Sequence, residues 1–291
     1  MGYVDLYLSG RRMSLGGGEE VAKLIGVPFD STSSYRPGSR FGPDAIRGAF
    51  SNIEVYSPEL SVDLERLRVD DLGNLKFTSN VEEMLDALGK VVSELVAEGS
   101  TVGILGGEHT LTLASFQAMP EDTALLVFDA HFDIREEYGG ARVSHATFLR
   151  RLIEKIGGDR IMHLGGRAAC REEWESLEEL SLANVPSSTI MLGGAERLVK
   201  EFLSDKRRVY VSIDLDVLDP AYAPAVGNPE PLGLTTHQLI RLLHSIRGKE
   251  VVGFDICEYT PIYDNGATGV VAAKLLADML SLAYLARAGG R

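Results

Sequence analysis

Short apolar runs alternate along the chain with longer segments in which apolar residues recur at three- and four-residue spacing. The short runs predict strands at 23–27, 66–70, 101–105, 124–129, 160–164, 187–192, 208–214 and 250–256. The longer segments predict helices at 81–97, 146–156, 195–203 and 239–246. Apolar strands separated by helices are typical of a parallel sheet with helices on both faces.

The local signals at helix starts agree with this α/β pattern. Thr235 and Gln238 have the spacing of a capping box, and Pro43 suits the first turn of a short helix after Gly42. No internal repeat, low-complexity tract or Pro/Gly/Ser-rich linker divides the sequence, which predicts a single domain over residues 1–291. A closed eight-stranded barrel is the alternative topology. In either fold, ligands bind where the carboxyl ends of the strands meet the loops.

Net charge and cysteine content restrict the partners and the compartment. A formal net charge of -13 argues against nucleic acid or an anionic membrane and favours cationic ligands. Cys170 and Cys257, the two cysteines, give no disulfide framework and suit a reducing cytosol. No signal peptide is recognisable, because Asp5 interrupts the apolar stretch at the N-terminus.

The most apolar long segment, 271–285, contains Lys274 and Asp278. We interpret it as a half-buried helix, since a membrane span would be more uniformly apolar. The sequence therefore predicts a soluble, cytoplasmic protein.

Residues of metal-ligand type gather at three predicted strand ends. Asp129, His131 and Asp133 alternate after one apolar run, and Asp214 and Asp216 alternate after another. Alternate residues of an extended chain point the same way, so each set can converge on one point. His109 follows a third run and completes a set of four carboxylates and two imidazoles.

This set is large enough for two divalent ions that share bridging carboxylates. Because the set is rich in oxygen ligands and contains no cysteine, it favours Mn²⁺ over Zn²⁺. The general order of affinities among divalent first-row metals also allows Co, Ni or Fe. A single Asp after a strand is usually a turn former or helix cap, so the argument depends on the repeated spacing. We interpret His163 as structural and His237 and His244 as surface residues.

The segments around these residues resemble the signature motifs of the ureohydrolases, the family of arginases and agmatinases. The resembling segments are Tyr35–Pro43, Gly106–His109, Asp129–Asp133, Ser144–Arg150, Ser212–Pro220 and Gly253–Glu258. They extend over nearly the whole chain and are most similar to archaeal-type agmatinases. The resemblance implies a three-layer α/β/α sandwich around an eight-stranded parallel sheet, and so decides against the barrel. It also implies a homo-oligomer, a trimer or hexamer.

The resemblance further implies two Mn ions per chain. One ion would be bound by His109, Asp129, Asp133 and Asp214, and the other by Asp129, His131, Asp214 and Asp216. Asp129 and Asp214 would therefore bridge the ions. Two metals bridged by one oxygen lower the pKa of a water molecule, so that hydroxide forms near neutral pH and can attack the guanidinium carbon.

Three residues are assigned to the reaction by the same resemblance. Asp133 would accept a hydrogen bond from the hydroxide and carry its proton to the leaving amine. Glu258 would hold the guanidinium, and bidentate pairing would orient it. His145 would contact the substrate or take part in proton transfer, although a histidine at a helix start can also be structural.

The substrate prediction depends on the loop 134–144. This loop lacks the Asn that arginases use to bind the α-carboxylate, and Glu136 and Glu137 could attract the ammonium of agmatine or be solvated loop charges. Arg135 and Arg142 could instead bind a carboxylate. We predict hydrolysis of agmatine to urea and putrescine, a step of polyamine biosynthesis. Arginase or guanidinobutyrase activity is the alternative within the family.

Other protein classes are less consistent with the motifs. A metallophosphoesterase would need more His and Asn ligands than a chain with six histidines offers readily. A non-catalytic regulator of the ureohydrolase type would not need the full ligand set and Glu258. A deacetylase-type relative would bind one metal and lack the counterparts of His109 and Asp133.

Overall fold

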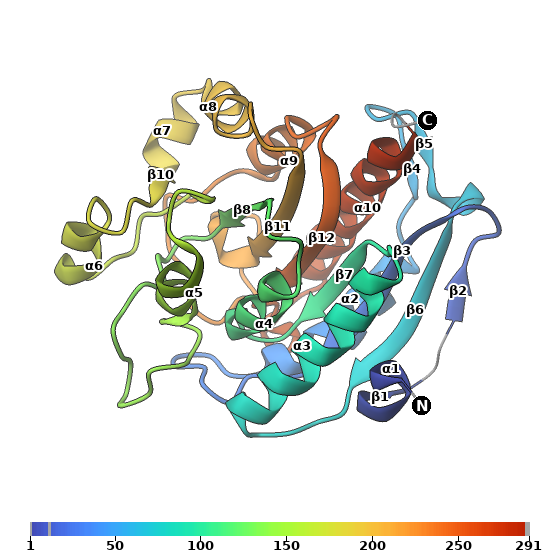
Figure 1. The fold of residues 1–291 in the computed structure, drawn as a ribbon. Helices are drawn as coiled ribbons and strands as arrows, with labels where there is room; N and C mark the ends of the chain where they lie inside the picture. The colour runs from blue at the N-terminus through green and yellow to red at the C-terminus, as the bar shows by residue number, and fades with distance from the viewer. Residues whose placement is uncertain (1, 11–12, 289–291) are drawn as a thin grey trace.

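The chain forms a three-layer α/β/α sandwich in the computed structural model, which describes residues 2–10 and 13–288 (Figure 1). Seven parallel pairings join eight strands into the central sheet. Their order is β6 (Arg68–Leu75), β3 (Glu20–Val27), β7 (Val102–Gly106), β12 (Glu250–Cys257), β11 (Arg208–Asp214), β8 (Thr123–Phe128), β9 (Ile161–Leu164) and β10 (Ala183–Val185). The predicted parallel sandwich is confirmed.

Two further strands extend the sheet beyond the predicted eight. β1 (Leu8–Ser9) and β2 (Met13–Leu15) both pair antiparallel with β6, giving ten strands among the described residues. Each is too short to show a recognisable periodicity in the sequence. Both pair with the edge strand β6. Strands β3 and β7 separate β6 from the central strands β12, β11 and β8.

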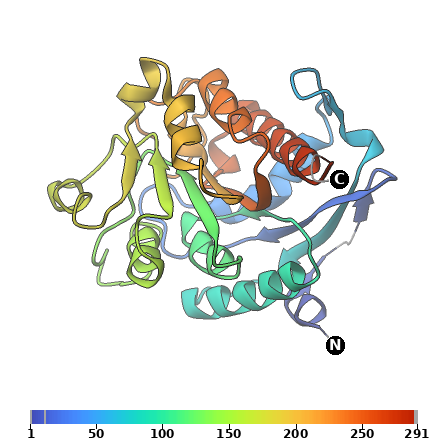
Figure 2. The same ribbon diagram turned by 45° about the horizontal axis from the view of Figure 1, so that its top comes forward.

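Helices cover both faces of the sheet because successive strand residues point to opposite sides. In β8, Leu126 and Phe128 pack into the core on one face, whereas Leu125 and Val127 pack into the core on the other. The first core is covered by α2 (Gly42–Phe50), α8 (Ala195–Phe202), α9 (Thr236–His244) and α10 (Ala267–Ala288). The second is covered by α3 (Val81–Ala97), α4 (Thr112–Gln117) and α5 (Phe148–Ile156) (Figure 2).

The predicted helix starts are confirmed at α9 and α2. Thr235 and Gln238 form a complete capping box, and Pro43 lies in the first turn of α2. The strand predicted at 187–192 is wrong, because Ser187–Met191 is the short helix α7. The nearest strand of the structure is β10, which comes just before this segment and ends at Val185. Pro186 follows it, lacks the N–H that a sheet ladder requires, and has a fixed φ that suits a helix start.

The apolar segment 271–285 lies within α10, which packs on β12 and α2. By length and composition α10 could cross a membrane, but 67% of its most apolar window is buried inside the protein. A helix that is apolar all round is typical of a protein core. The helix is thus more deeply buried than predicted.

Candidate metal centre and its cavity

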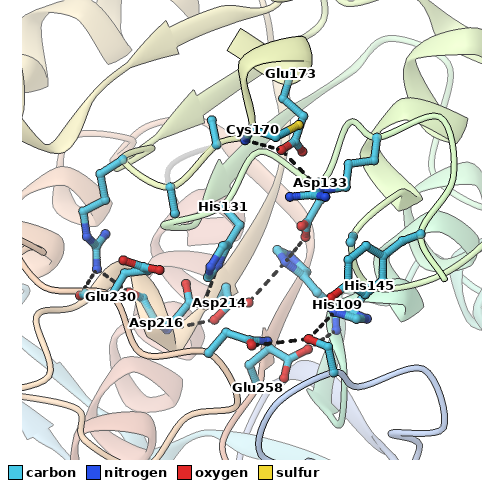
Figure 3. A pocket seen from close by; sticks show the side chains of 18 residues that line it. His109, His131, Asp133, His145, Cys170, Glu173, Asp214, Asp216, Glu230 and Glu258 are labelled. Carbon is cyan, nitrogen blue, oxygen red and sulfur yellow. Dashed lines mark hydrogen bonds and ion pairs between the residues drawn. The ribbon is translucent and has the colours of Figure 1, made fainter.

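A cavity of about 510 Å³ opens at the carboxyl ends of the central strands. Its lining includes five of the six predicted ligands together with Glu258 and His145 (Figure 3). The sixth, Asp129, lies at the end of β8 and is almost completely buried beneath the others. The strand ends therefore bring together residues that are up to 149 positions apart in the sequence, as in the hydrogen bond from His109 N to Glu258.

The first ligand group surrounds the Nδ1 atom of His109. This atom lies 2.8 Å from Asp129 Oδ2, 3.4 Å from Asp214 Oδ2 and 3.6 Å from Asp133 Oδ2. His109 Nδ1 and Asp129 Oδ2 are both buried and make no hydrogen bond among the described residues. Two unsatisfied ligand atoms that face each other in a buried site fit a cation that binds both.

The second ligand group surrounds His131, on the side of Asp129 opposite to His109. His131 Nδ1 lies 2.9 Å from Asp216 Oδ2 and 3.6 Å from Asp129 Oδ1. Asp129 thus offers one oxygen to each group, as expected of a bridging carboxylate. Asp214 has one oxygen in the first group, and its other oxygen accepts a hydrogen bond from Asp216 N at 2.8 Å.

The charges of the cluster also favour a cation. Burial, followed by the negative charge of Asp129, raises the pKa of the Asp133 carboxyl to about 7. Burial, followed by the charges of Asp216 and Asp129, raises the pKa of Asp214 well above its ordinary value. Buried carboxylates that oppose each other's ionisation are stabilised in the charged form by a bound cation.

The backbone has a left-handed conformation at two of the predicted site residues, and it is strained at Glu258. Asp133 and Glu258 have φ of 52° and 63°, and they are two of the five non-glycine residues with positive φ among the described residues. This conformation is unfavourable for side chains other than Gly, Asn or Asp, and it is often retained where function requires a particular orientation. Here it directs both carboxylates toward the cavity.

A buried polar network behind His109 was not anticipated from the sequence. His109 Nε2 lies 2.8 Å from Ser212 Oγ, and Ser212 donates to Asp255 Oδ1 at 2.6 Å. Tyr210 and Thr112 donate to the other oxygen of Asp255 at 2.7 and 3.0 Å. Because the network engages Nε2, it leaves Nδ1 facing the carboxylates. The feature of the sequence that could have indicated this network is the alternation of Ser212 with Asp214 in β11, which places both side chains on one face of the strand.

Asp255→Asn is expected to weaken the binding of divalent metal by roughly 10- to 100-fold, because the charge that orients Ser212 and His109 is lost. Metal titration of the stripped protein measures the effect, and excess metal should restore activity. The circular dichroism spectrum should remain that of the wild type. Unchanged metal affinity in a folded variant would show that Asp255 stabilises the core without orienting His109.

Glu258 lies at the cavity wall with one oxygen engaged and the other oriented toward the open space. Its Oε1 accepts a hydrogen bond from His109 N at 2.8 Å. A Cβ atom on Gly227 would lie 3.1 Å from Oε2, so the absence of a side chain there leaves this oxygen accessible. Burial, followed by the charge of Glu108, raises the pKa of Glu258 well above its ordinary value. A cationic ligand would counter that effect.

His145 lines the cavity and is held by the loop before α2. Its Nδ1 lies 3.2 Å from Thr32 Oγ1, and its Nε2 lies 3.3 Å from Ser34 Oγ. Burial, followed by the positive charge of His131, lowers the pKa of His145 to about 4, so the imidazole is neutral at pH 7. A neutral imidazole in this position can accept or relay a proton.

The structure does not place the predicted glutamates Glu136 and Glu137 in the cavity. Both are exposed, and Glu136 pairs with Arg150 and Arg151. Arg142 is 69% exposed in its side chain and also lies outside the lining, so it cannot bind a carboxylate there. The exposed part of the loop lies outside the cavity, and these three side chains point to solvent.

Other residues occupy the outer wall instead. Arg135 does line the cavity, where its Nε lies 3.4 Å from a Glu173 oxygen. Glu173 and Glu230 are the acidic residues that sequence reasoning missed there.

The remaining histidines lie outside the cavity lining. His163 is completely buried in β9, where its Nε2 lies 2.6 Å from the backbone oxygen of His131, in agreement with a structural role. His237 is exposed as predicted. His244 is half-buried between Glu59 and Asp278, and so is less exposed than the sequence suggested.

Comparisons with known proteins give one consistent family. The model of the arginase family matches residues 21–281 of this chain. The agmatinase of Bacillus anthracis is 38% identical over 90% of this chain and 91% of its own length. The agmatinase of Pyrococcus horikoshii is 35% identical over 87% of this chain and 88% of its own. The solved agmatine ureohydrolase of Thermoplasma volcanium, 38% identical, superposes with a TM-score of 0.87 over 94% of this chain and 92% of its own.

Proposed function

The chain belongs to the arginase family, and from that premise we propose that it hydrolyses agmatine to urea and putrescine at a pair of bound Mn²⁺ ions. The observation that carries the proposal is the pair of ligand groups that share Asp129. They lie in the same cavity as Glu258, whose accessible oxygen can pair with a guanidinium.

Each ligand-type residue has a role in this proposal. His109, Asp129, Asp133 and Asp214 would hold one ion, and Asp129, His131, Asp214 and Asp216 the other. Two divalent ions, when bound, supply a hydroxide nucleophile at neutral pH. The hard carboxylate oxygens favour Mn²⁺.

The side chains around the ions would orient the substrate and move the proton. Glu258 would pair with the guanidinium and present its carbon to the nucleophile. Asp133, whose carboxylate faces His109 in the first ligand group, would carry the proton to the leaving amine. His145, which also lines the cavity, would assist as a neutral base.

The substrate proposal follows from charge. The cavity lining includes six carboxylates. Asp133, Asp214 and Asp216 would hold the ions and Glu173 pairs with Arg135, which leaves Glu258 and Glu230 to act on the substrate. A dication gains from such a field at both ends, whereas arginine must bring its carboxylate into it. Arg135 is the residue that supports the alternative, an arginase or guanidinobutyrase, because it lines the cavity. Its pairing with Glu173 weakens that alternative.

Urea release with Mn²⁺ from agmatine, arginine, guanidinobutyrate and guanidinopropionate tests the substrate. We expect kcat/KM for agmatine to exceed that for arginine by at least about a hundredfold, which corresponds to ~2.7 kcal/mol of discrimination. If arginine or guanidinobutyrate is the better substrate, the substrate proposal is wrong and Arg135 becomes the residue that selects a carboxylate.

Three broader features belong to the same proposal. We propose one domain over residues 1–291, a cytoplasmic location and a homo-oligomeric state. The apolarity of α10 does not support the oligomer, because the helix is used within the chain. The trimer or hexamer therefore stays a prediction from the family resemblance.

A further inference from the structure

Two acidic residues on the cavity wall have no role in the metal centre or in guanidinium pairing. Among the described residues that line the cavity, these are Glu173 and Glu230. Glu173 lies in the first turn of the short helix α6 (Arg171–Ser176), and Glu230 lies on the loop before α9. A substrate cation can pair only with a carboxylate whose hydrogen bonds and charge are not already used within the protein.

Glu173 is already committed to the protein. One of its oxygens accepts from Cys170 N at 3.0 Å at the start of α6 (Arg171–Ser176), and the other accepts from Ile134 N at 3.4 Å. Arg135 neutralises its charge at 3.4 Å. The side chain is 5% exposed. Glu173 therefore fixes the loop 134–144 to α6, and its charge is balanced before any substrate binds.

The only cation of the lining close to Glu230 among the described residues, Arg167, is also committed. Its guanidinium donates to six backbone carbonyl oxygens at 2.7 to 3.3 Å, and none of these bonds uses a carboxylate. The acceptors are the carbonyls of Gly165, Asp216, Val217, Leu218, Glu230 and Pro231. Arg167 thus fastens the backbone of Glu230 to the loop of the metal ligand Asp216, without forming an ion pair with the Glu230 side chain.

Local sequence makes the position of Glu230 rigid. It stands between Pro229 and Pro231, and each proline fixes its own φ and restricts the residue before it. Its carbonyl is held by Arg167 Nη2 at 2.8 Å. The backbone of such a segment loses little conformational entropy when its carboxylate binds a ligand.

The Glu230 carboxylate has no direct partner, although the charge of Arg167 acts on it at longer range. Among the residues that the structure describes, it makes no hydrogen bond and has no cationic partner within ion-pair distance. In Figure 3 it lies on the side of the cavity formed by Asp216 and His131, apart from Glu258 and across from His145. Ala168 and Ala169 also line the cavity, and their methyl groups suit contact with the methylenes of a substrate.

We propose that Glu230 is the specificity-determining residue of the cavity and that its carboxylate binds the second cationic group of the substrate, the ammonium at the end opposite to the guanidinium. This inference rests on the proposed function and assigns the recognition of the second charge to one side chain. Substrates with two cationic ends separated by an alkyl chain are then preferred over guanidines with a neutral or anionic tail.

Glu230→Gln tests the inference, because it keeps the size of the side chain and removes its charge. The measurement is kcat/KM for agmatine and for butylguanidine, which has the same guanidinium and carbon chain but no ammonium. We expect the preference for agmatine over butylguanidine to fall by roughly 10- to 100-fold, the effect of losing a hydrogen bond to a charged group. Inhibition by putrescine should weaken likewise, whereas inhibition by butylamine should change little.

The ratio of the two substrates separates recognition of the ammonium from general effects. A change in metal content or in folding alters both substrates together, since both carry the guanidinium. A change in the overall field of the cavity acts more strongly on the dication, so the loss of a charge elsewhere needs its own control. Glu172→Gln is the matched control, because Glu172 is exposed on α6 and loses the same charge. An unchanged ratio in Glu230→Gln, or an equal loss with both substrates, overturns the inference. Failure of the wild type to release urea from agmatine would instead remove the proposed function, and the inference with it.

Discussion

Replacing Asp214 by alanine is expected to abolish urea release, with kcat reduced by at least about a thousandfold. A catalytic metal ion contributes several kcal/mol of transition-state stabilisation, and each ~1.4 kcal/mol is worth a factor of ten in rate. Asp214 Oδ2 faces His109 Nδ1 at 3.4 Å, and Asp214 Oδ1 receives the hydrogen bond of Asp216 N. One substitution therefore removes a ligand of the first group and disturbs the orientation of Asp216 in the second.

Metal analysis of the same variant separates this explanation from misfolding. We expect about two divalent ions per wild-type chain, lower occupancy in Asp214→Ala, and a folded protein by circular dichroism. Asp205→Ala is a suitable control, because the Asp205 side chain is 77% exposed and lies outside the cavity lining. Chelation of the wild type should reproduce the loss of activity, and Mn²⁺ should reverse it. Full turnover by Asp214→Ala or by stripped protein would refute the metal mechanism.

The gathering of the ligands could be predicted because it follows from local geometry. In an extended segment, alternate side chains share a face, and parallel strands end at one edge of the sheet. Asp129, His131 and Asp133 need no knowledge of distant contacts to be recognised as one set. The same holds for Asp214 and Asp216. The structure adds that Asp129 is shared between the two groups, as the family resemblance implied.

The outer wall of the cavity could not be predicted in this way, because it depends on contacts between loops. Glu136 and Glu137 are near the metal motif in sequence, but Arg150 and Arg151 on α5 hold Glu136 outside the cavity. Glu230 lies far along the chain and is brought to the wall by Arg167. Carbonyl acceptors are present at every residue, so no sequence pattern shows that a guanidinium will bind them.

The error at 187–192 has a similar origin. The segment is apolar enough for a strand, but Leu192 is 90% exposed and Met191 is 53% exposed. Composition alone does not distinguish a short buried strand from a short helix with two buried residues, such as α7. Pro186 was the available signal, because proline ends a sheet ladder more readily than it interrupts a helix start.

Glu258→Gln is expected to reduce kcat/KM for agmatine by roughly 100- to 1,000-fold while metal content stays unchanged. Breaking a buried ion pair by removing the charge of one partner costs about 3–5 kcal/mol. The Gln side chain can still accept the hydrogen bond that His109 N donates to Glu258 Oε1, so the turn before the metal ligand keeps its support. What is lost is the negative charge on the accessible oxygen. Substrate binding and rate should therefore fall together, as measured by KM and kcat with agmatine.

The metal content of the same variant decides between two roles of Glu258. Neither ligand group includes Glu258, whose Oε1 is engaged by the backbone of His109. Loss of metal in Glu258→Gln would make the residue a ligand or a support of the metal site, and guanidinium pairing would then have to come from elsewhere. Retained metal with wild-type KM would also contradict the pairing. Retained metal with impaired binding is the result that follows from a carboxylate held at positive φ, fixed through one oxygen and open to a cation through the other.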